Sequence, residues 1–205
     1  MQYRRLGQVD FQSTFESMKA FTASRTSDTE DEIWLLQHPP VYTQGLSGKA
    51  EHVLDPRGIP VIQIDRGGQV TYHGPGQWVA YVLYDLRRAG VNIRELVSLL
   101  ECAVINLLAE FNVTAYGDPA ARGVYVDGRK IAALGLKVSR GRSYHGLSLN
   151  ADMDLIPFSG INPCGHAGLD VTSVARELGE ACYPSTPVLG EALLEHLGRL
   201  LPQDA

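Results

Sequence analysis

The spacing of apolar residues along the chain predicts three long helices and one short one. After Asp10, a residue type that caps helix N-termini, a stripe at helical spacing runs from Phe11 to about Ala23. A longer stripe follows the capping-box pair Asn92 and Glu95 and ends near Asn112. A short helix is expected from Thr172 to Leu178, before Gly179, and a final helix from Pro187 to Leu201. The inward positions of the first stripe are Phe11, Phe15, Met18 and Thr22; those of the second are Leu96, Leu100, Ala103, Val104, Leu107 and Phe111; those of the last are Leu189, Leu193, Leu197 and Leu200.

Strand-like segments alternate with these helices. Buried or extended strands are predicted at 32–38, 41–45, 59–65 and 78–86, the first of them stopped by two prolines. Asp127-Gly128 is a strong hairpin signal, and a second turn is expected at 140–142, so that residues 123–150 form a three-stranded antiparallel meander. Strands interleaved with long helices favour a fold of the α/β or α+β class, in which helices flank a mixed β-sheet. At 205 residues, we expect a single domain spanning 1–205.

One stretch fits neither pattern. Residues 66–77 read RGGQVTYHGPGQ, with four glycines, a proline, an arginine and a histidine between two apolar runs. Glycine permits positive φ and close backbone approach, so the stretch is either a hairpin with an unusual turn or the backbone-lined wall of a pocket. It does not match a phosphate-binding loop. Five residues separate Gly68 from Gly74, and no Lys-Ser or Lys-Thr pair follows.

Composition narrows the function classes. The 44% hydrophobic and 20% charged content is typical of a globular protein, and the net charge of −5 argues against nucleic acid as a partner. The first residues lack the apolar core of a signal peptide, and no run approaches the length of a membrane span. Three cysteines without a CxxC pair favour free thiols, and we expect a cytoplasmic protein.

Cys164 is the strongest candidate for a nucleophile. It lies between Pro163, which fixes φ, and Gly165, which permits a sharp turn, and such a bend presents a thiol beside free backbone N–H groups. The alternative is a structural cysteine. Cys102 is expected on the solvent side of its helix with Ser98 and Asn106, and Cys182 is expected to be a small core residue.

A thiol needs a base, and Lys130 is the first candidate. By strand alternation it shares a face with Ala132, Leu134, Leu136 and Val138, so it is either an edge lysine in water or a desolvated amine able to take a proton. Lys137 falls on the other face and is expected in solvent. His73 and His145 are alternative bases, whereas His166 is too close to Cys164 in sequence. No metal-binding pattern is present, and we expect no metal and no cofactor.

Four motifs occur together in order: RGGQVTYHGPGQ, GRKIAALG, HGLSLN and NPCG. With HPPVYTQG and the EHV beginning at Glu51, they make the chain resemble the lipoyl(octanoyl) transferases of lipoate biosynthesis, which are relatives of the biotin and lipoate protein ligases. The resemblance covers about residues 33 to 173 and shows no departure at a key position.

The resemblance implies an α/β fold like that of the ligases and an enzyme that moves an octanoyl group from acyl carrier protein to a lysine of a lipoyl domain. The implied acceptors are the lipoyl domains of 2-oxoacid dehydrogenase complexes and the glycine cleavage H protein, with no nucleic acid and no membrane. It assigns an acyl-thioester to Cys164 and an acid/base role to Lys130. It also assigns substrate contacts to three segments, which are Arg66, Gly67, Gly68, Gln69, Val70, Thr71, Tyr72 and His73; Ala133, Leu134 and Gly135; and Gly146, Leu147 and Ser148.

Several points stay open at this stage. Small residues at 132, 133 and 135 leave room for an acyl chain beside a strand. An ATP-dependent lipoate or biotin ligase and a non-catalytic acyl-binding module are the competing hypotheses. The carrier proteins and lipoyl domains implied by the resemblance are acidic, as this chain is, so a local basic surface is expected. Its candidates are Arg87, Arg88, Arg122, Arg129, Arg140 and Arg142.

Overall fold

A computed structural model describes residues 1–165, 167–179 and 181–202. Its main feature is a seven-stranded sheet of order β1-β2-β6-β10-β9-β8-β7. Only the β1–β2 pair is parallel, and the other pairs are antiparallel. The strands are β1 (Gln2–Gln8), β2 (Glu32–Gln37), β6 (Gln77–Leu83), β7 (Tyr116–Gly117), β8 (Val124–Val126), β9 (Arg129–Ser139) and β10 (Arg142–Asn150). The mixed sheet predicted from the sequence is therefore confirmed.

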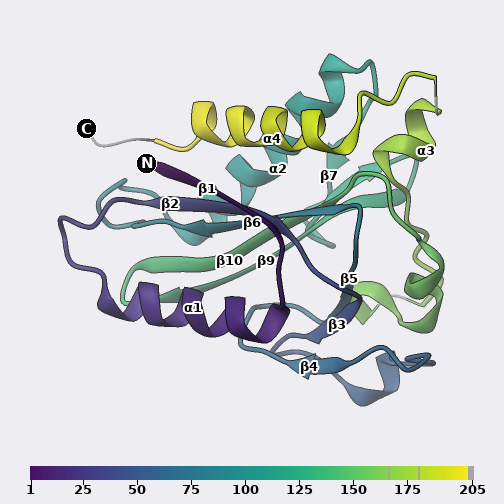
Figure 1. The fold of residues 1–205 in the computed structure, drawn as a ribbon, viewed down its shortest axis with the longest axis horizontal. Coiled ribbons are helices and arrows are strands. Elements are labelled where there is room, and N and C mark those ends of the chain that lie inside the picture. The colour runs from purple at the N-terminus through teal and green to yellow at the C-terminus, as the bar shows by residue number, and fades with distance from the viewer. Residues whose placement is uncertain (166, 180, 203–205) are drawn as a thin grey trace.

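Helices cover both faces of this sheet (Figure 1). On one face lie α2 (Ile93–Glu110) and α4 (Thr186–Leu200), and on the other lies α1 (Phe11–Ser24). Alternate residues of β6 point to opposite faces of the sheet. Ala80 and Val82 pack in the core under α2 and α4, and Val79 and Tyr81 pack in the core under α1. A strand buried on both faces explains why the segment reads as continuously apolar.

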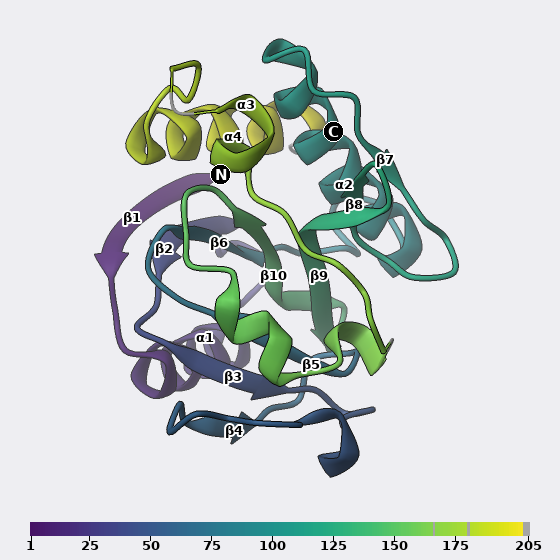
Figure 2. The same ribbon diagram turned by 90° about the vertical axis from the view of Figure 1, so that its right-hand side faces the viewer.

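A second, three-stranded sheet of order β4-β3-β5 packs beside the first (Figure 2). It comprises β3 (Val41–Gln44), β4 (Val61–Gln63) and β5 (Val70–His73), and short 3-10 helices η1 (Ala50–His52), η2 (Ile156–Gly160) and η3 (Pro163–Gly165) border it. Tyr42, Tyr72 and Phe158 form its small core. β5 is the middle of the glycine-rich stretch, so this stretch contains a strand that the glycines concealed.

The predicted caps and turns are present. Asp10 accepts a hydrogen bond from the Ser13 amide at 2.9 Å, and Asn92 with Glu95 forms a complete capping box. Asp127 and Gly128 have φ of 48° and 79°, and the β9–β10 turn repeats this with Arg140 at 52° and Gly141 at 82°. Two successive positive φ values fit tight hairpins to the right-handed twist of the strands. The meander is therefore confirmed.

Some predictions were wrong. Cys182 is exposed rather than part of the core, while Cys102 is exposed as expected. The strand expected at 59–65 shrinks to the three residues of β4. β1 and β7 carried no recognisable signal, since all seven residues of β1 are exposed. The short helix α3 (Val174–Leu178) ends at Gly179 as predicted. Within the described ranges, none of the helices combines the length and apolarity that a membrane crossing requires.

Candidate functional site

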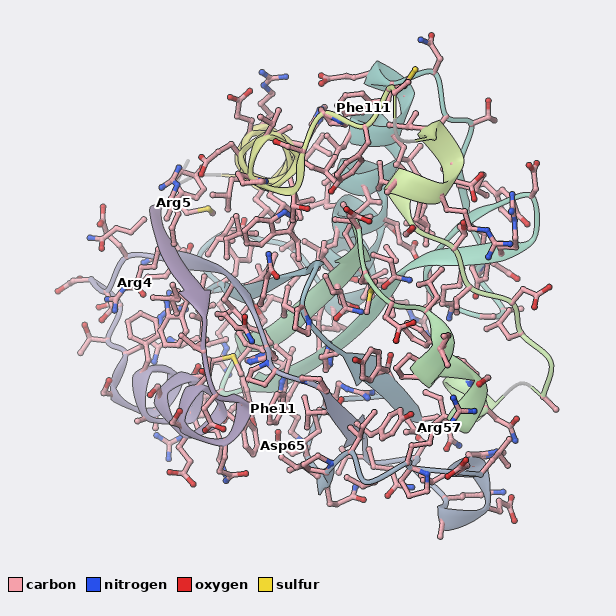
Figure 3. All side chains as sticks on the ribbon, turned by 45° about the vertical axis from the view of Figure 1, so that its right-hand side comes forward. Arg4, Arg5, Phe11, Arg57, Asp65 and Phe111 are labelled. Carbon is pink, nitrogen blue, oxygen red and sulfur yellow. The ribbon has the colours of Figure 1, made fainter. Side chains whose placement is uncertain are left out.

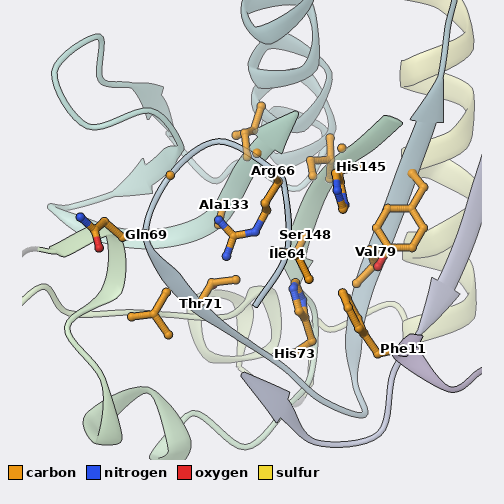
Figure 4. A pocket seen from close by; sticks show the side chains of 17 residues that line it. Phe11, Ile64, Arg66, Gln69, Thr71, His73, Val79, Ala133, His145 and Ser148 are labelled. Atoms are coloured by element: carbon orange, nitrogen blue, oxygen red, sulfur yellow. The ribbon is translucent and has the colours of Figure 1, made fainter. Parts of the chain in front are cut away.

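A largely apolar pocket lies between the centre of the main sheet and the glycine-rich stretch (Figure 4). The space inside it is about 520 Å³, open solvent at its mouth included. β9 and β10 form one wall, the segment from Ile64 to His73 forms the opposite wall, and the first residue of α1 contributes Phe11 at one end. The sequence motifs thus converge on one cavity.

Most of the substrate contacts implied by the resemblance line this pocket. Of the fourteen residues, twelve are in its lining: Arg66, Gly68, Gln69, Val70, Thr71, His73, Ala133, Leu134, Gly135, Gly146, Leu147 and Ser148. Gly67 lies outside the lining, because its amide binds the Leu136 carbonyl at 3.0 Å. Tyr72 also lies outside it, because its side chain belongs to the small core of the second sheet. Ala132 does not leave room for a chain as expected, since it is buried in the main core. Substrate contact by the twelve stays a prediction.

Arg66 is the cation of this pocket. Its side chain is buried, and its guanidinium donates to the Thr43 carbonyl at 2.7 Å and to the Gly67 carbonyl at 2.9 Å. Gly135 is required opposite it, because a Cβ there would come within 2.8 Å of the Arg66 Cδ. The aliphatic part of the Arg66 side chain therefore packs against Gly135, and its guanidinium is held by the Thr43 and Gly67 carbonyls.

His73 is held as a neutral imidazole. Its Nδ1 lies 2.7 Å from the Gln77 Oε1, so Nδ1 carries the proton, and Nε2 lies 3.3 Å from the Thr43 hydroxyl. Burial lowers the pKa of His73 to about 3, with a further contribution from His38. Gln77 donates onward to Asn150 at 2.9 Å, and Asn150 donates to the Thr172 carbonyl at 2.9 Å. A neutral histidine with a low pKa is a weak base, which disfavours His73 as the group that takes a thiol proton.

A cluster of aromatic and histidine side chains closes the end of the pocket near α1. His38 lies between the Val9 carbonyl at 2.8 Å and the Tyr81 hydroxyl at 2.7 Å, and its ring meets that of Phe11 at 5.1 Å. Phe11, Ile64, Val79, Tyr81 and His145 line the pocket although the motifs did not point to them as substrate contacts. The available signal was the helical stripe that placed Phe11 and Phe15 inward, but nothing in the sequence links it to this pocket.

His145 is paired with a carboxylate. Its Nε2 lies 2.9 Å from Asp65, and the neighbouring Tyr144 hydroxyl donates to the other oxygen of the same carboxylate at 2.5 Å. Adjacent residues of a strand normally point to opposite faces, and the positive φ of 61° at His145 brings both to one side. Despite a desolvation cost, the bonds from His145 and Tyr144 lower the pKa of Asp65 to about 2.

Lys130 is buried, which resolves the choice between an edge lysine and a desolvated one. Only 3% of the residue is exposed; its Nζ donates to the Arg122 carbonyl at 3.3 Å and lies 5.2 Å from the centre of the Tyr125 ring. The prediction that Lys130 shares a face of β9 with Ala132 was wrong. The register shifts between the Tyr125–Lys130 and Val124–Ala132 pairs, and this shift interrupts the alternation of side chains along the strand. Lys137 is half-buried rather than in solvent.

Glu101 and Gly123, which the sequence patterns did not single out, determine where Lys130 lies. Glu101 of α2 is buried and binds both the Gly123 amide and the Arg122 guanidinium at 3.1 Å, which fixes the loop before β8. At Gly123, a Cβ would lie 2.9 Å from the Lys130 Cε. On its other side, the Lys130 backbone binds Asp170 and Thr172, both at 2.9 Å. The segment after Cys164 therefore runs along the strand that carries the lysine.

Cys164 lies in η3, whose backbone is described, whereas the Cys164 side chain and all of His166 lie outside the described part of the chain. η3 is placed by its neighbours: Asn162 donates to the His52 carbonyl at 2.9 Å, and the Gly165 amide turns back to the Asn162 carbonyl at 2.9 Å. A Cβ on Gly165 would meet the Gln69 Cγ at 3.3 Å. Since Gln69 lines the pocket, η3 lies beside one end of it.

Comparison with known proteins agrees with this geometry. The family model of the lipoyl protein ligase A/B catalytic domain matches residues 10–198. An octanoyltransferase of Aromatoleum aromaticum is 58% identical over 199 residues, which cover 97% of this chain and 85% of that protein. A bi-partite lipoate protein ligase from Thermoplasma acidophilum has the same fold, with a TM-score of 0.77 at 17% identity over 98% of this chain and 84% of that one. For a biotin protein ligase from Aquifex aeolicus the TM-score is 0.59 at 12% identity, over 98% and 69% of the two chains.

Proposed function

The chain belongs to the lipoyl protein ligase A/B catalytic domain family, and from this membership we propose that it is an octanoyltransferase of protein lipoylation. It takes the octanoyl group from octanoyl acyl carrier protein and passes it to a lysine of lipoyl domains, those of 2-oxoacid dehydrogenases and the glycine cleavage H protein included. The observation that carries the proposal is the continuity of β9. This strand bears the buried Lys130 and, three residues on, the pocket wall from Ala133 to Gly135.

The pocket suits the acyl chain. Burying six methylenes and a methyl contributes at most ~5–6 kcal/mol at ~0.8 kcal/mol for each group. The lining also holds several polar side chains, as expected of a site that positions one end of an amphipathic ligand: Arg66, Gln69, Thr71, His73, Tyr81, His145 and Ser148.

The first half-reaction loads the enzyme. Lys130 takes the proton of the Cys164 thiol, and the thiolate attacks the carbonyl carbon of the donor thioester. A carbon–sulfur bond to Cys164 forms, the bond to the carrier sulfur breaks, and the carrier thiolate regains the proton from Lys130. Burial of the lysine supports this role, since desolvation favours the neutral amine that can accept a proton.

The second half-reaction transfers the octanoyl group from the enzyme to the acceptor lysine. The amine of the acceptor lysine attacks the acyl-enzyme, the amide bond forms, and the Cys164 sulfur leaves and takes up the proton released by the amine. Exchange between thioesters is nearly balanced and amide formation is downhill. The cycle therefore needs neither ATP nor a cofactor.

Intact-mass measurement after incubation with octanoyl acyl carrier protein tests the proposal. We expect an octanoyl adduct that hydroxylamine removes, that is absent in Cys164→Ala and that nearly disappears in Lys130→Ala. Lys19→Ala, which removes an exposed lysine of α1, serves as the control and keeps the adduct. An adduct that survives both hydroxylamine and Cys164→Ala contradicts the thioester.

The ATP-dependent ligase gives the opposite pattern. It would form an octanoyl adenylate from free octanoate and labelled ATP and would need no Cys164. A non-catalytic acyl-binding module would retain octanoyl binding in Cys164→Ala without any transfer in the unaltered protein. The first result would identify the protein as an ATP-dependent ligase, and the second would identify it as an acyl-binding module.

A further inference from the structure

An exposed apolar patch lies on the outer edge of the sheet, on the other side of the glycine-rich stretch from the pocket. Leu46 is 62% exposed and Ile93 is 39% exposed, and with the half-buried Leu136 and Val138 they line one shallow hollow. We call this set the β9-edge patch. Gly67 belongs to the same hollow, and its neighbours Arg66 and Gly68 line the pocket. The patch is therefore separated from the pocket by the backbone of the glycine-rich stretch.

The edge of β9 is open at this patch. β8 pairs with β9 only as far as Ala132, and the Gly67 amide binds the Leu136 carbonyl. Beyond that bond, the described residues add no further strand to this side of β9. An uncovered strand edge beside exposed apolar side chains is a typical site for a partner.

Basic residues surround the patch. Lys137 lines it, Arg87 lies against Gly141, which also lines it, and Arg140 precedes Gly141 in the β9–β10 turn. Within the described residues, none of these three side chains has an ion pair with an acid. Of the acids in the same segments, Asp85 pairs with Arg142, Asp65 binds Tyr144 and His145, and Glu95 accepts a hydrogen bond from the Asn92 amide.

The other basic candidates from the sequence are neutralised. Arg88 pairs with Asp31, Arg122 with Glu101, Arg129 with Glu177 and Arg142 with Asp85. Of the six basic candidates from the sequence, the two without an ion pair among the described residues, Arg87 and Arg140, thus both lie beside this patch. This arrangement is complementary to an acidic partner that also buries apolar side chains.

Two acidic partners could dock at this patch, the carrier protein and the lipoyl domain, and the distance from the patch to Lys130 distinguishes them. Leu136 is six residues from Lys130 along β9, which corresponds to about 20 Å at the rise of a strand. A lysine side chain cannot bridge that distance, whereas a thioester on a long prosthetic arm can. The acceptor lysine must therefore approach from elsewhere.

We propose that the β9-edge patch, with Arg87, Lys137 and Arg140, is the docking surface for the acidic carrier protein that delivers the octanoyl thioester. The inference rests on the proposed function, because it requires a carrier-borne donor. The carrier covers Leu46 and Ile93 with apolar side chains and pairs its carboxylates with the three cations. Its arm then crosses the glycine-rich stretch near Gly67 to enter the pocket, because β8 covers the outer edge of β9 at Lys130.

Charge reversal tests this surface. In the triple variant Arg87→Glu/Lys137→Glu/Arg140→Glu, we expect the KM for octanoyl carrier protein to rise at least tenfold at low ionic strength while kcat stays unchanged. With octanoyl pantetheine, an uncharged donor, kcat/KM should equal that of the unaltered enzyme. Equal losses with both donors, or no change with either, would overturn the proposal. So would a rise in KM confined to the acceptor.

A matched control uses the opposite edge of the sheet. Arg5 extends from β1 and Arg199 lies on α4; both are exposed (Figure 3 labels Arg5). Arg5→Glu/Arg199→Glu makes the net charge about four units more negative, against about six for the triple variant, and should leave the KM for the carrier within twofold. A larger rise of the KM for the carrier in this control than in the triple variant would contradict docking at the β9-edge patch.

A binding measurement separates the docking surface from the proposed function. Fluorescence anisotropy of labelled octanoyl carrier protein reports complex formation with the Cys164→Ala enzyme, in which no transfer occurs. We expect the triple variant to weaken this complex tenfold or more. If the unaltered enzyme binds the carrier at the patch yet transfers nothing, the proposed function fails and the docking surface stands. If transfer proceeds but the triple variant binds normally, the docking surface fails and the function stands.

Discussion

At the scale of single residues, the pocket is defined as much by missing side chains as by those present. Gly135 leaves space for the Arg66 side chain, and Gly123 leaves space for Lys130. At Gly146, a Cβ would lie 2.0 Å from the Ala80 carbonyl oxygen, so β10 can approach β6 only with glycine there. These contacts give physical reasons for one glycine in each of two motifs, GRKIAALG and HGLSLN, and for Gly123 before β8.

Gly135→Ala tests this reasoning at the pocket. The added methyl would lie 2.8 Å from the Arg66 Cδ and 3.2 Å from the Gly67 carbonyl, so the arginine must move. We expect the rate of octanoyl adduct formation to fall about tenfold while the free energy of unfolding falls by about 1 kcal/mol, because a shifted side chain relieves most of the overlap. Ser139→Ala, at the exposed end of the same strand, is the control for stability. Unchanged adduct formation in Gly135→Ala would show that the position of Arg66 does not matter.

At the scale of elements, local patterns predicted most of the structure, and long-range contacts supplied the rest. The capped helices and the meander follow from spacing and turn residues close in sequence. β1 could not be predicted, because its exposed residues become a strand only by pairing with β2. The burial of Lys130 depends on segments 122–125 and 170–172, and the cluster at the pocket end unites His38, His73 and Phe11 from three elements. The motifs placed twelve pocket residues, but no local pattern could reveal these supports.

The element that closes the pocket is α1, and Phe11 is its residue in the lining. In Phe11→Leu, we expect the ratio of decanoyl to octanoyl transfer to rise several-fold, since one methylene in an apolar pocket is worth about 1–3 kcal/mol. Phe21→Leu makes the same change on the same helix, where the ring packs on Trp34 instead, and should leave the ratio unchanged. Competition between the two acyl donors measures it. An equal shift in both variants would mean that α1 acts through stability rather than pocket length.

At the scale of the whole molecule, the buried polar groups link function to acid stability. His38, His73 and His145 lie around Phe11, Phe15 and Tyr81, and burial lowers the pKa of each histidine. The charged groups facing them are Asp10 near His38, Arg66 near both His73 and His145, and Asp65 with Lys19 near His145. The pocket is therefore built to keep its histidines neutral.

This neutrality predicts how stability depends on pH. The folded state holds His73 with a pKa of about 3 against 6.5 when unfolded, so the unfolded chain binds more protons between these values. Unfolding that takes up protons is favoured by acid, so the free energy of unfolding is greatest above pH 6.5 and falls as the pH drops towards 3. Each proton taken up contributes a slope of about 1.4 kcal/mol per pH unit. Asp65, whose folded pKa is about 2 against 3.8, adds a separate loss between pH 3.8 and 2.

Urea denaturation at pH 7.5, 6.0 and 5.0 measures this slope. We expect the unaltered protein to lose stability across the series, and His73→Gln to lose less per pH unit because one titrating group is gone. Its stability at pH 7.5 is lower from the start, since glutamine fills the imidazole site imperfectly. The diagnostic quantity is therefore the slope and not the midpoint. A slope equal to that of the unaltered protein would place the acid sensitivity outside the pocket, whereas a flatter slope ties it to the same buried imidazole that the pocket holds neutral.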